Sequence, residues 1–148
     1  MSSRDKTCHD DFLAIAAKIW LSAKHHFKNK LKEKKYDLTF EQVLVLYILD
    51  ESEGVNLGQI AEKADRERTT ISRMVDGLER RNLVLRVPDK ADKRQKLLYL
   101  TNLGRDRIAE TNEMVPDFFE RMYQGVTNEE VEKSLEIQKK ILANIMEM

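Results

Sequence analysis

A run of arginine and hydroxyl side chains lies near the middle of the chain. It comprises Arg66, Arg68, Thr69, Thr70, Ser72 and Arg73. Arginine can donate two hydrogen bonds to guanine O6 and N7, and small hydroxyl residues let a helix sink into a major groove about 12 Å wide. The segment could therefore recognise the base edges of DNA. An ordinary solvated helix face would have a similar composition, so this run alone leaves both interpretations open.

A second charged segment, PDKADKRQ, occupies positions 88–95 between two short apolar runs at 83–87 and 96–100. The apolar runs predict two strands of a hairpin. An eight-residue loop is longer than a tight hairpin needs, so we expect it to project as a functional wing. A basic hairpin tip can reach DNA phosphates or a neighbouring minor groove. The candidate contacts on this wing are Lys90, Lys93, Arg94 and Lys96.

The distribution of charge supports one functional surface in the middle of the chain. The 148 residues carry 26 Lys plus Arg and 26 Asp plus Glu, so the formal net charge is zero. Residues 55–96, however, carry eleven basic and seven acidic side chains (+4), whereas residues 97–148 carry six basic and ten acidic (−4). Such a basic centre is typical of a surface that meets a polyanion.

The composition argues against several other classes of protein. The five glycines are too scattered for a phosphate-binding or dinucleotide-binding loop, and no GxSxG or HExxH motif occurs, so we expect neither an enzyme nor a cofactor. One cysteine excludes an internal disulfide and a zinc site with two or more thiolates. The three histidines lack the spacing of metal ligands, so no metal is expected.

We also expect a soluble, cytoplasmic protein without a membrane segment. The longest apolar run is VLVLYIL at 43–49, far short of the roughly 20 residues that a membrane-spanning helix needs. The first residues, MSSRDKTCHDD, contain no apolar stretch typical of a secretory signal.

Apolar spacing and capping residues predict the helices that would position these segments. An i, i+3, i+4 pattern predicts a long helix over about 10–35, and capping signals at 39–42 and 56–59 predict helices through about 51 and 64. A fourth helix should begin after Asp65 or Arg66 and run to about 81. Its expected inward side chains are Ile71, Val75 and Leu78. Asn82 suits the left-handed conformation that ends a helix.

The last third of the chain is also predicted to be helical. A helix beginning after Thr101 should carry Ile108, Val115, Phe118, Phe119 and Met122, with Pro116 interrupting it. A capping box at 127–130 predicts the last helix. Two short helices followed by a two-stranded ribbon form the arrangement of a winged helix-turn-helix. We therefore expect a mainly α fold with a small β-hairpin wing.

From Leu38 to Gly104 the sequence resembles the MarR family of bacterial winged helix-turn-helix regulators. LTFEQVLVLYIL is similar to the second helix of the family, and LGQIAEKADRERTTISRMVDGLERRNLVLR to its helix-turn-helix and first wing strand. The wing carries the D-x-R signature at Asp92 and Arg94, followed by LTxxG at 100–104. Asn82 departs from the glycine that is usual there in the family.

The resemblance implies a homodimer that binds a pseudo-palindromic operator in double-stranded DNA, most often as a repressor. It implies three regions: an N-terminal dimerisation helix at 1–36, a DNA-binding lobe at 37–102, and C-terminal dimerisation helices at 103–148. Thr69, Thr70 and Arg73 would enter the major groove and Arg94 the flanking minor groove. Asp92 would orient a nearby arginine rather than touch DNA.

The resemblance also implies release by a small aromatic or phenolic effector, near which we place Trp20 and Tyr47, although either side chain could be an ordinary core residue. Some members of the family sense peroxides through a cysteine inside the first helix. Cys8 precedes the apolar periodicity that begins at Phe12, so we expect an inert exposed thiol. Redox sensing through Cys8 remains an alternative, as does a winged-helix protein-interaction module that does not bind DNA.

Overall fold

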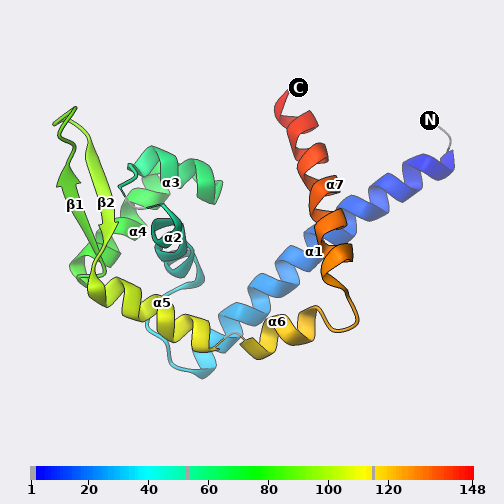
Figure 1. Ribbon diagram of the computed structural model, residues 1–148, viewed down its shortest axis with the longest axis horizontal. Coiled ribbons are helices and arrows are strands. Elements are labelled where there is room, and N and C mark those ends of the chain that lie inside the picture. Colours follow the sequence, from blue (N-terminus) through cyan, green and yellow to red (C-terminus); the bar gives the residue numbers. More distant parts are fainter. Residues whose placement is uncertain (1–2, 53, 115) are drawn as a thin grey trace. The chain divides into compact units, whose positions relative to one another are not determined.

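The computed structural model describes residues 3–52, 54–114 and 116–148 (Figure 1). The chain divides into two compact units, Met1–Glu113 and Met114–Met148. Among the described residues, the first unit holds helices α1 to α5 and a two-stranded antiparallel sheet, and the second holds α6 and α7. The mainly α fold with a small hairpin agrees with the sequence-based expectation. Within the described residues, every helix is too short or too polar to cross a membrane.

The first four helices are α1 (Ser3–Glu33), α2 (Phe40–Glu51), α3 (Leu57–Ala64) and α4 (Arg68–Arg80). The predicted caps of α2 and α3 are confirmed. The Thr39 hydroxyl accepts a hydrogen bond from the amide of Gln42 at 3.2 Å. The Asn56 side chain accepts one from the amide of Gln59 at 3.0 Å. In both boxes the glutamine side-chain oxygen accepts a bond from the backbone amide of the cap residue, so two free donors are satisfied at each helix start.

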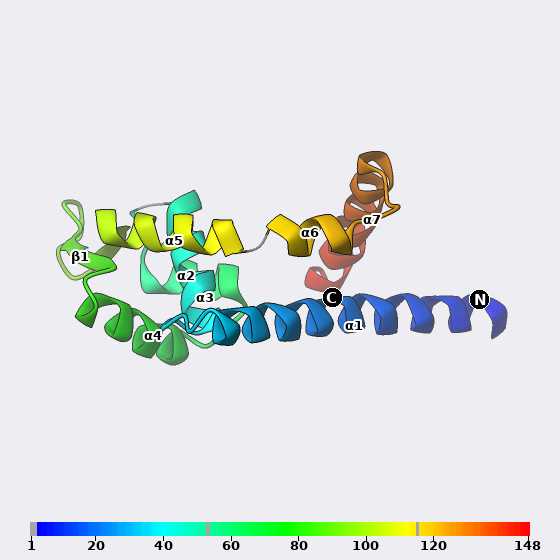
Figure 2. The same cartoon turned by 90° about the horizontal axis from the view of Figure 1, so that it is seen from below.

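The first helix is longer than its apolar pattern predicted. It begins at Ser3 rather than near Asp10, and runs without a break to the loop before α2 (Figures 1 and 2). Apolar periodicity marks only the part of a helix that packs, and the residues of α1 before Phe12 carry no such pattern. Cys8 therefore lies inside α1, and its placement ahead of the first helix was wrong.

The core of the first unit surrounds α2. Five of the seven residues at 43–49 are buried, which agrees with a helix that is apolar on most faces. Ile60 from α3, Leu78 from α4 and Leu98 from the second strand are fully buried against this core. The three inward residues predicted for α4 are all buried, so the opposite face of this helix is left to solvent.

The hairpin consists of β1 (Val84–Pro88) and β2 (Lys96–Leu100), paired from Val84 opposite Leu100 to Pro88 opposite Lys96. The first strand is one residue later than predicted and the second agrees with the prediction. Val55, just before α3, forms an isolated bridge with Leu98, which ties the base of the hairpin to the helices.

Two residues in the left-handed conformation set the turns around α3 and α4. Asp65 ends α3 at φ 49°, and Asn82 follows α4 at φ 57°. Both side-chain types tolerate this conformation, as the sequence indicated. The turns fix where α4 begins and where the chain enters β1.

The helix α5 (Asn102–Met114) follows the hairpin, and the Thr101 hydroxyl accepts a hydrogen bond from the amide of Gly104 at 3.0 Å. In the second unit, α6 spans Pro116–Met122 and α7 spans Asn128–Met146. The predicted interruption near Pro116 is confirmed, since α5 ends at Met114 and α6 starts at Pro116. Val115 lies outside the described residues. The Thr127 capping box at the start of α7 is also confirmed.

Candidate nucleic-acid interface

The outward face of α4 carries the predicted base-reading side chains. Arg68, Thr69 and Arg73 are exposed, whereas Thr70 and Ser72 are half-buried. The buried residues Ile71, Val75 and Leu78 recur at the spacing of one helix face. The cations and hydroxyls therefore project on the side of α4 that is open to a ligand.

The wing tip is ordered by its own side chains. The Asp92 carboxylate accepts hydrogen bonds from the backbone amide of Arg94 at 3.1 Å and from its Nε at 3.2 Å. The Asp89 carboxylate accepts one from the amide of Ala91 at 3.0 Å. The side chain of Arg94 is nevertheless 92 % exposed. Asp92 thus orients the Arg94 side chain through its Nε atom, while most of that side chain stays exposed to solvent.

The wing and the start of α4 enclose a groove of about 480 Å³. Its lining includes four cationic side chains, Arg68, Arg86, Arg94 and Lys96. Arg86 is paired with carboxylates of α4, so Arg68, Arg94 and Lys96 are the side chains of this groove that could attract an anion such as a phosphate. We call the exposed residues Arg68, Thr69, Arg73, Lys93, Arg94 and Lys96 the helix–wing surface.

Comparison with known protein families matches residues 38–96 to the model of the MarR family. This segment contains α2, α3, α4, β1 and the wing loop. The segment from α2 to the wing loop is therefore similar to the MarR family.

Proteins similar to this chain are named as transcriptional regulators. The repressor IacR of Pseudomonas putida is 27 % identical over 117 residues, which cover 77 % of this chain and 70 % of that protein. The regulator BldR of Sulfolobus solfataricus has a crystal structure with a TM-score of 0.80 and 28 % identity, covering 97 % and 99 % of the two chains. The repressor CouR, solved on a 23-mer DNA duplex, has a TM-score of 0.74 and 26 % identity, covering 86 % and 89 %. The chain thus has the winged-helix fold of these transcriptional regulators and is similar to them in sequence.

One arginine of this chain was missed by sequence reasoning. Arg86, in the middle of β1, donates hydrogen bonds to the carboxylates of Glu79 at 2.5 Å and Asp76 at 2.6 Å, both on α4. A signal was present in the sequence, because Asp76 and Glu79 are three residues apart and therefore share a helix face. Their pairing with a strand residue depends on tertiary packing, which spacing alone does not reveal.

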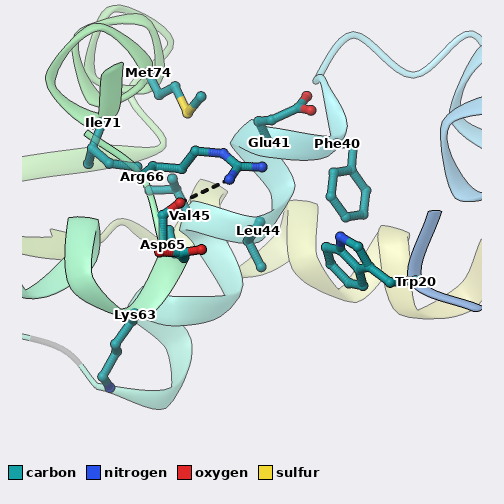
Figure 3. A pocket seen from close by; sticks show the side chains of 11 residues that line it. Trp20, Phe40, Glu41, Leu44, Val45, Lys63, Asp65, Arg66, Ile71 and Met74 are labelled. Carbon is teal, nitrogen blue, oxygen red and sulfur yellow. Dashed lines mark hydrogen bonds between the residues drawn. The ribbon is translucent and has the colours of Figure 1, made fainter. Parts of the chain in front are cut away.

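Arg66 is exposed, like Arg68 and Arg73, but it does not line the groove beside the wing. It lines a second pocket of about 320 Å³, formed by α1, α2, the α3–α4 turn and α4. Its guanidinium donates a hydrogen bond to the carbonyl of Asp65 at 2.9 Å and reaches toward α2 (Figure 3). Trp20 and Phe40 also line this pocket, with ring centroids 6.1 Å apart in an edge-to-face arrangement. The pocket therefore combines an aromatic wall with a cation.

Glu41, one of the two acidic residues that line this pocket, is paired with two lysines. Glu41 pairs with Lys24 at 3.0 Å and with Lys28 at 3.3 Å. Partial burial raises the pKa of Glu41, but the hydrogen bond from Lys24 and the further bonds outweigh it and bring the pKa below its usual value. The carboxylate stays ionised and paired, so it opposes a bound anion less than a free carboxylate would.

The structure does not place Tyr47 with Trp20. The Tyr47 hydroxyl donates a hydrogen bond to the Asn112 side chain on α5, and burial raises the pKa of this phenol. Tyr47 is absent from the described residues that line the Trp20 pocket. Cys8 is exposed on α1. Its position inside the first helix removes the reason by which we separated it from the peroxide-sensing members of the family.

Proposed function

We propose that this chain is a bacterial, cytoplasmic repressor that binds a pseudo-palindromic operator as a homodimer. The helix–wing surface is the observation that supports the proposal. It combines exposed arginine and hydroxyl side chains on α4 with an exposed, carboxylate-anchored arginine on the wing. In this proposal α4 enters the major groove through Thr69, Thr70 and Arg73, while Arg94 reaches the flanking minor groove. The similarity of this chain to CouR, solved on a DNA duplex, and to the repressor IacR supports the proposal.

The proposed homodimer explains the apolar side chains that are exposed on α1 and α7. On α1, Ile15 and Ile19 are 56 % and 58 % exposed. On α7, Leu142 and Ile145 are 57 % and 55 % exposed. Apolar surface of this extent is typical of a protein interface. A second copy would cover these faces and present two α4 helices to the two half-sites of an operator.

A selection of genomic fragments by the purified wild-type protein tests DNA recognition. We expect an inverted repeat to be recovered, since a symmetric dimer reads two half-sites. Binding to it should weaken steeply with salt, with a log–log slope near −7 if about 8 phosphates are contacted. Failure to bind any fragment at low salt would contradict the proposal and would favour a protein-interaction module instead.

We further propose that the pocket of Trp20, Phe40 and Arg66 binds a small aromatic acid that releases the operator. The aromatic rings can pack against an apolar ligand body, and the Arg66 guanidinium can pair with a carboxylate or phenolate. A ligand wedged between α1, α2 and α4 would shift operator affinity only if it binds the DNA-free form more tightly.

Titration with benzoate and its hydroxylated analogues tests the effector site. Trp20 is the chain's single tryptophan, so its fluorescence reports directly on the pocket. We expect saturable quenching together with loss of operator binding, and weaker binding of the acids by Arg66→Gln. Tyr47→Phe serves as the control because Tyr47 does not line this pocket. If none of the acids changes either the fluorescence or operator binding, this part of the proposal is wrong.

A further inference from the structure

We infer that Arg86 is a positioning residue for DNA recognition, because it fixes the wing against α4 so that both elements can engage one site. The inference rests on the proposed DNA-binding function. It assigns Arg86 a role distinct from that of the exposed residues of the helix–wing surface. Those residues would touch DNA, whereas Arg86 would act through the elements that carry them.

The geometry of Arg86 is that of a clamp between two elements. Its two terminal nitrogens bind two different carboxylates, Nη1 to Glu79 at 2.5 Å and Nη2 to Asp76 at 2.6 Å. The arginine side chain is only 18 % exposed. A guanidinium holds two acceptors in fixed directions, and such charge-assisted bonds are stronger than neutral ones. The pair of bonds therefore fixes both the distance and the angle between β1 and α4.

Among the described residues, the outer part of the wing has fewer ties to the helices than its base. One of them is a long hydrogen bond, 3.4 Å, from the Asn56 side chain at the start of α3 to the Gln95 side chain in the wing loop. Along β1, Val84 is buried and Arg86 is half-buried, whereas the other three side chains are exposed. Leu98, the β2 partner of Arg86, is the buried hairpin residue that lies nearest the wing loop. Beyond this level the hairpin extends away from the helices (Figure 1), and Arg94 in its loop is exposed. Since a small change of angle at Arg86 is amplified toward the tip, the clamp determines where Arg94 lies relative to α4.

The clamp also masks negative charge near the proposed DNA surface. Asp76 lies one helical turn after Arg73, and Glu79 lies one turn further. Without Arg86 these carboxylates would repel phosphate. Repulsion of DNA by the two carboxylates and positioning of the wing by Arg86 predict opposite effects when the two acids are neutralised. Neutralising the two acids should raise operator affinity if they only repel DNA, and should lower it if they hold the wing through Arg86.

The experiment compares Arg86→Lys, the double variant Asp76→Asn with Glu79→Gln, and the control Arg81→Lys. Lysine keeps the charge of Arg86 but cannot hold two carboxylates in fixed directions. Arg81 is a matched control, because it also pairs with a carboxylate, that of Asp37 at 3.6 Å, outside the wing. Each full-length variant is tested for affinity to the operator selected by the wild type, affinity to an unrelated duplex, salt dependence, and amide hydrogen exchange in residues 84–100.

We expect Arg86→Lys and the double variant to lower operator affinity by about tenfold, the factor for loss of a coupled interaction of ordinary strength. Affinity for the unrelated duplex and the salt slope should change little, and exchange in the wing should accelerate in both variants but not in Arg81→Lys. A salt slope reduced by about one per lost contact would make Arg86 a direct phosphate contact and overturn the inference. Higher operator affinity of the double variant, or unchanged wing exchange, would overturn it too. If the wild type binds no DNA, the proposed function fails, while the exchange measurement still decides whether Arg86 fixes the wing.

Discussion

Gly104→Ala is expected to lower the free energy of unfolding by about 3 kcal/mol, the upper end of the usual cost of overpacking. A Cβ atom at this position would lie 2.2 Å from the carbonyl oxygen of Leu83 and 3.2 Å from a methyl group of Leu100. The first of these contacts is with backbone, which cannot rotate away as a flexible side chain can. Gly104 is buried in the first turn of α5, so the helix and the strand entrance would have to separate.

The separation would break hydrogen bonds as well as packing. The Leu83 carbonyl accepts bonds from the amide of Thr101 at 3.1 Å and from its hydroxyl at 3.2 Å. The same hydroxyl accepts from the amide of Gly104. The glycine of the LTxxG signature is thus required where α5 passes the residue that precedes β1. The threonine of the signature links the two segments by its hydrogen bonds. The gain in helix propensity from alanine, about 1 kcal/mol, offsets only part of this loss.

Urea unfolding at one fixed protein concentration measures the effect, since a dimer would make stability concentration-dependent. Gly77→Ala is the matched control. It also lies in a helix, but its Cβ would meet the side-chain nitrogen of Gln42 at 3.3 Å, and a side chain can move. We expect the control to change stability by less than about 1 kcal/mol. Equal stability of Gly104→Ala and the wild type would mean that the contact between α5 and Leu83 is looser than the structure shows.

The local features of this fold were predictable from sequence because single residues determine them. Thr39, Asn56 and Thr127 cap helices through bonds to residues three positions later. Asp65 and Asn82 adopt the left-handed conformation that their side chains tolerate. The strand positions and the inward face of α4 followed from apolar spacing. In each case the interacting groups are close in sequence, so the pattern contains the information.

The features that sequence reasoning missed depend on residues that only the fold brings together. Arg86 meets its two carboxylates because β1 packs beside α4. Arg66 lines the Trp20 pocket because the turn after Asp65 directs it toward α2, although its place in the basic run indicated a DNA contact. The N-terminal turns of α1 carry no apolar face, and so periodicity could not mark them. Charge composition predicted the surface but not the pairing within it.

Arg73→Ala is expected to weaken operator binding by about 1–3 kcal/mol per subunit and to relax base preference at one position of each half-site. Arg73 is exposed on α4, one turn after Thr69 and on the side opposite the buried Ile71 and Val75. If Arg73 makes a bidentate pair with guanine, its loss should reduce the preference for guanine at that position. The affinity for all sequences should not fall equally. Binding to the operator and to its single-base variants measures both effects.

Arg94→Ala and Arg73→Lys separate the possible roles of these two arginines. Arg94 stands 92 % exposed at the wing tip, so its removal should lower operator affinity and alter preference only outside the α4 contacts. Arg73→Lys keeps the charge but loses the planar pair of donors, so it should preserve the salt slope while losing most of the discrimination at the same base. Equal weakening of Arg73→Ala on every sequence, with a salt slope reduced by about one per lost contact, would instead make Arg73 a phosphate contact. Base reading would then fall to Thr69 and Thr70, the other two α4 residues predicted to enter the major groove.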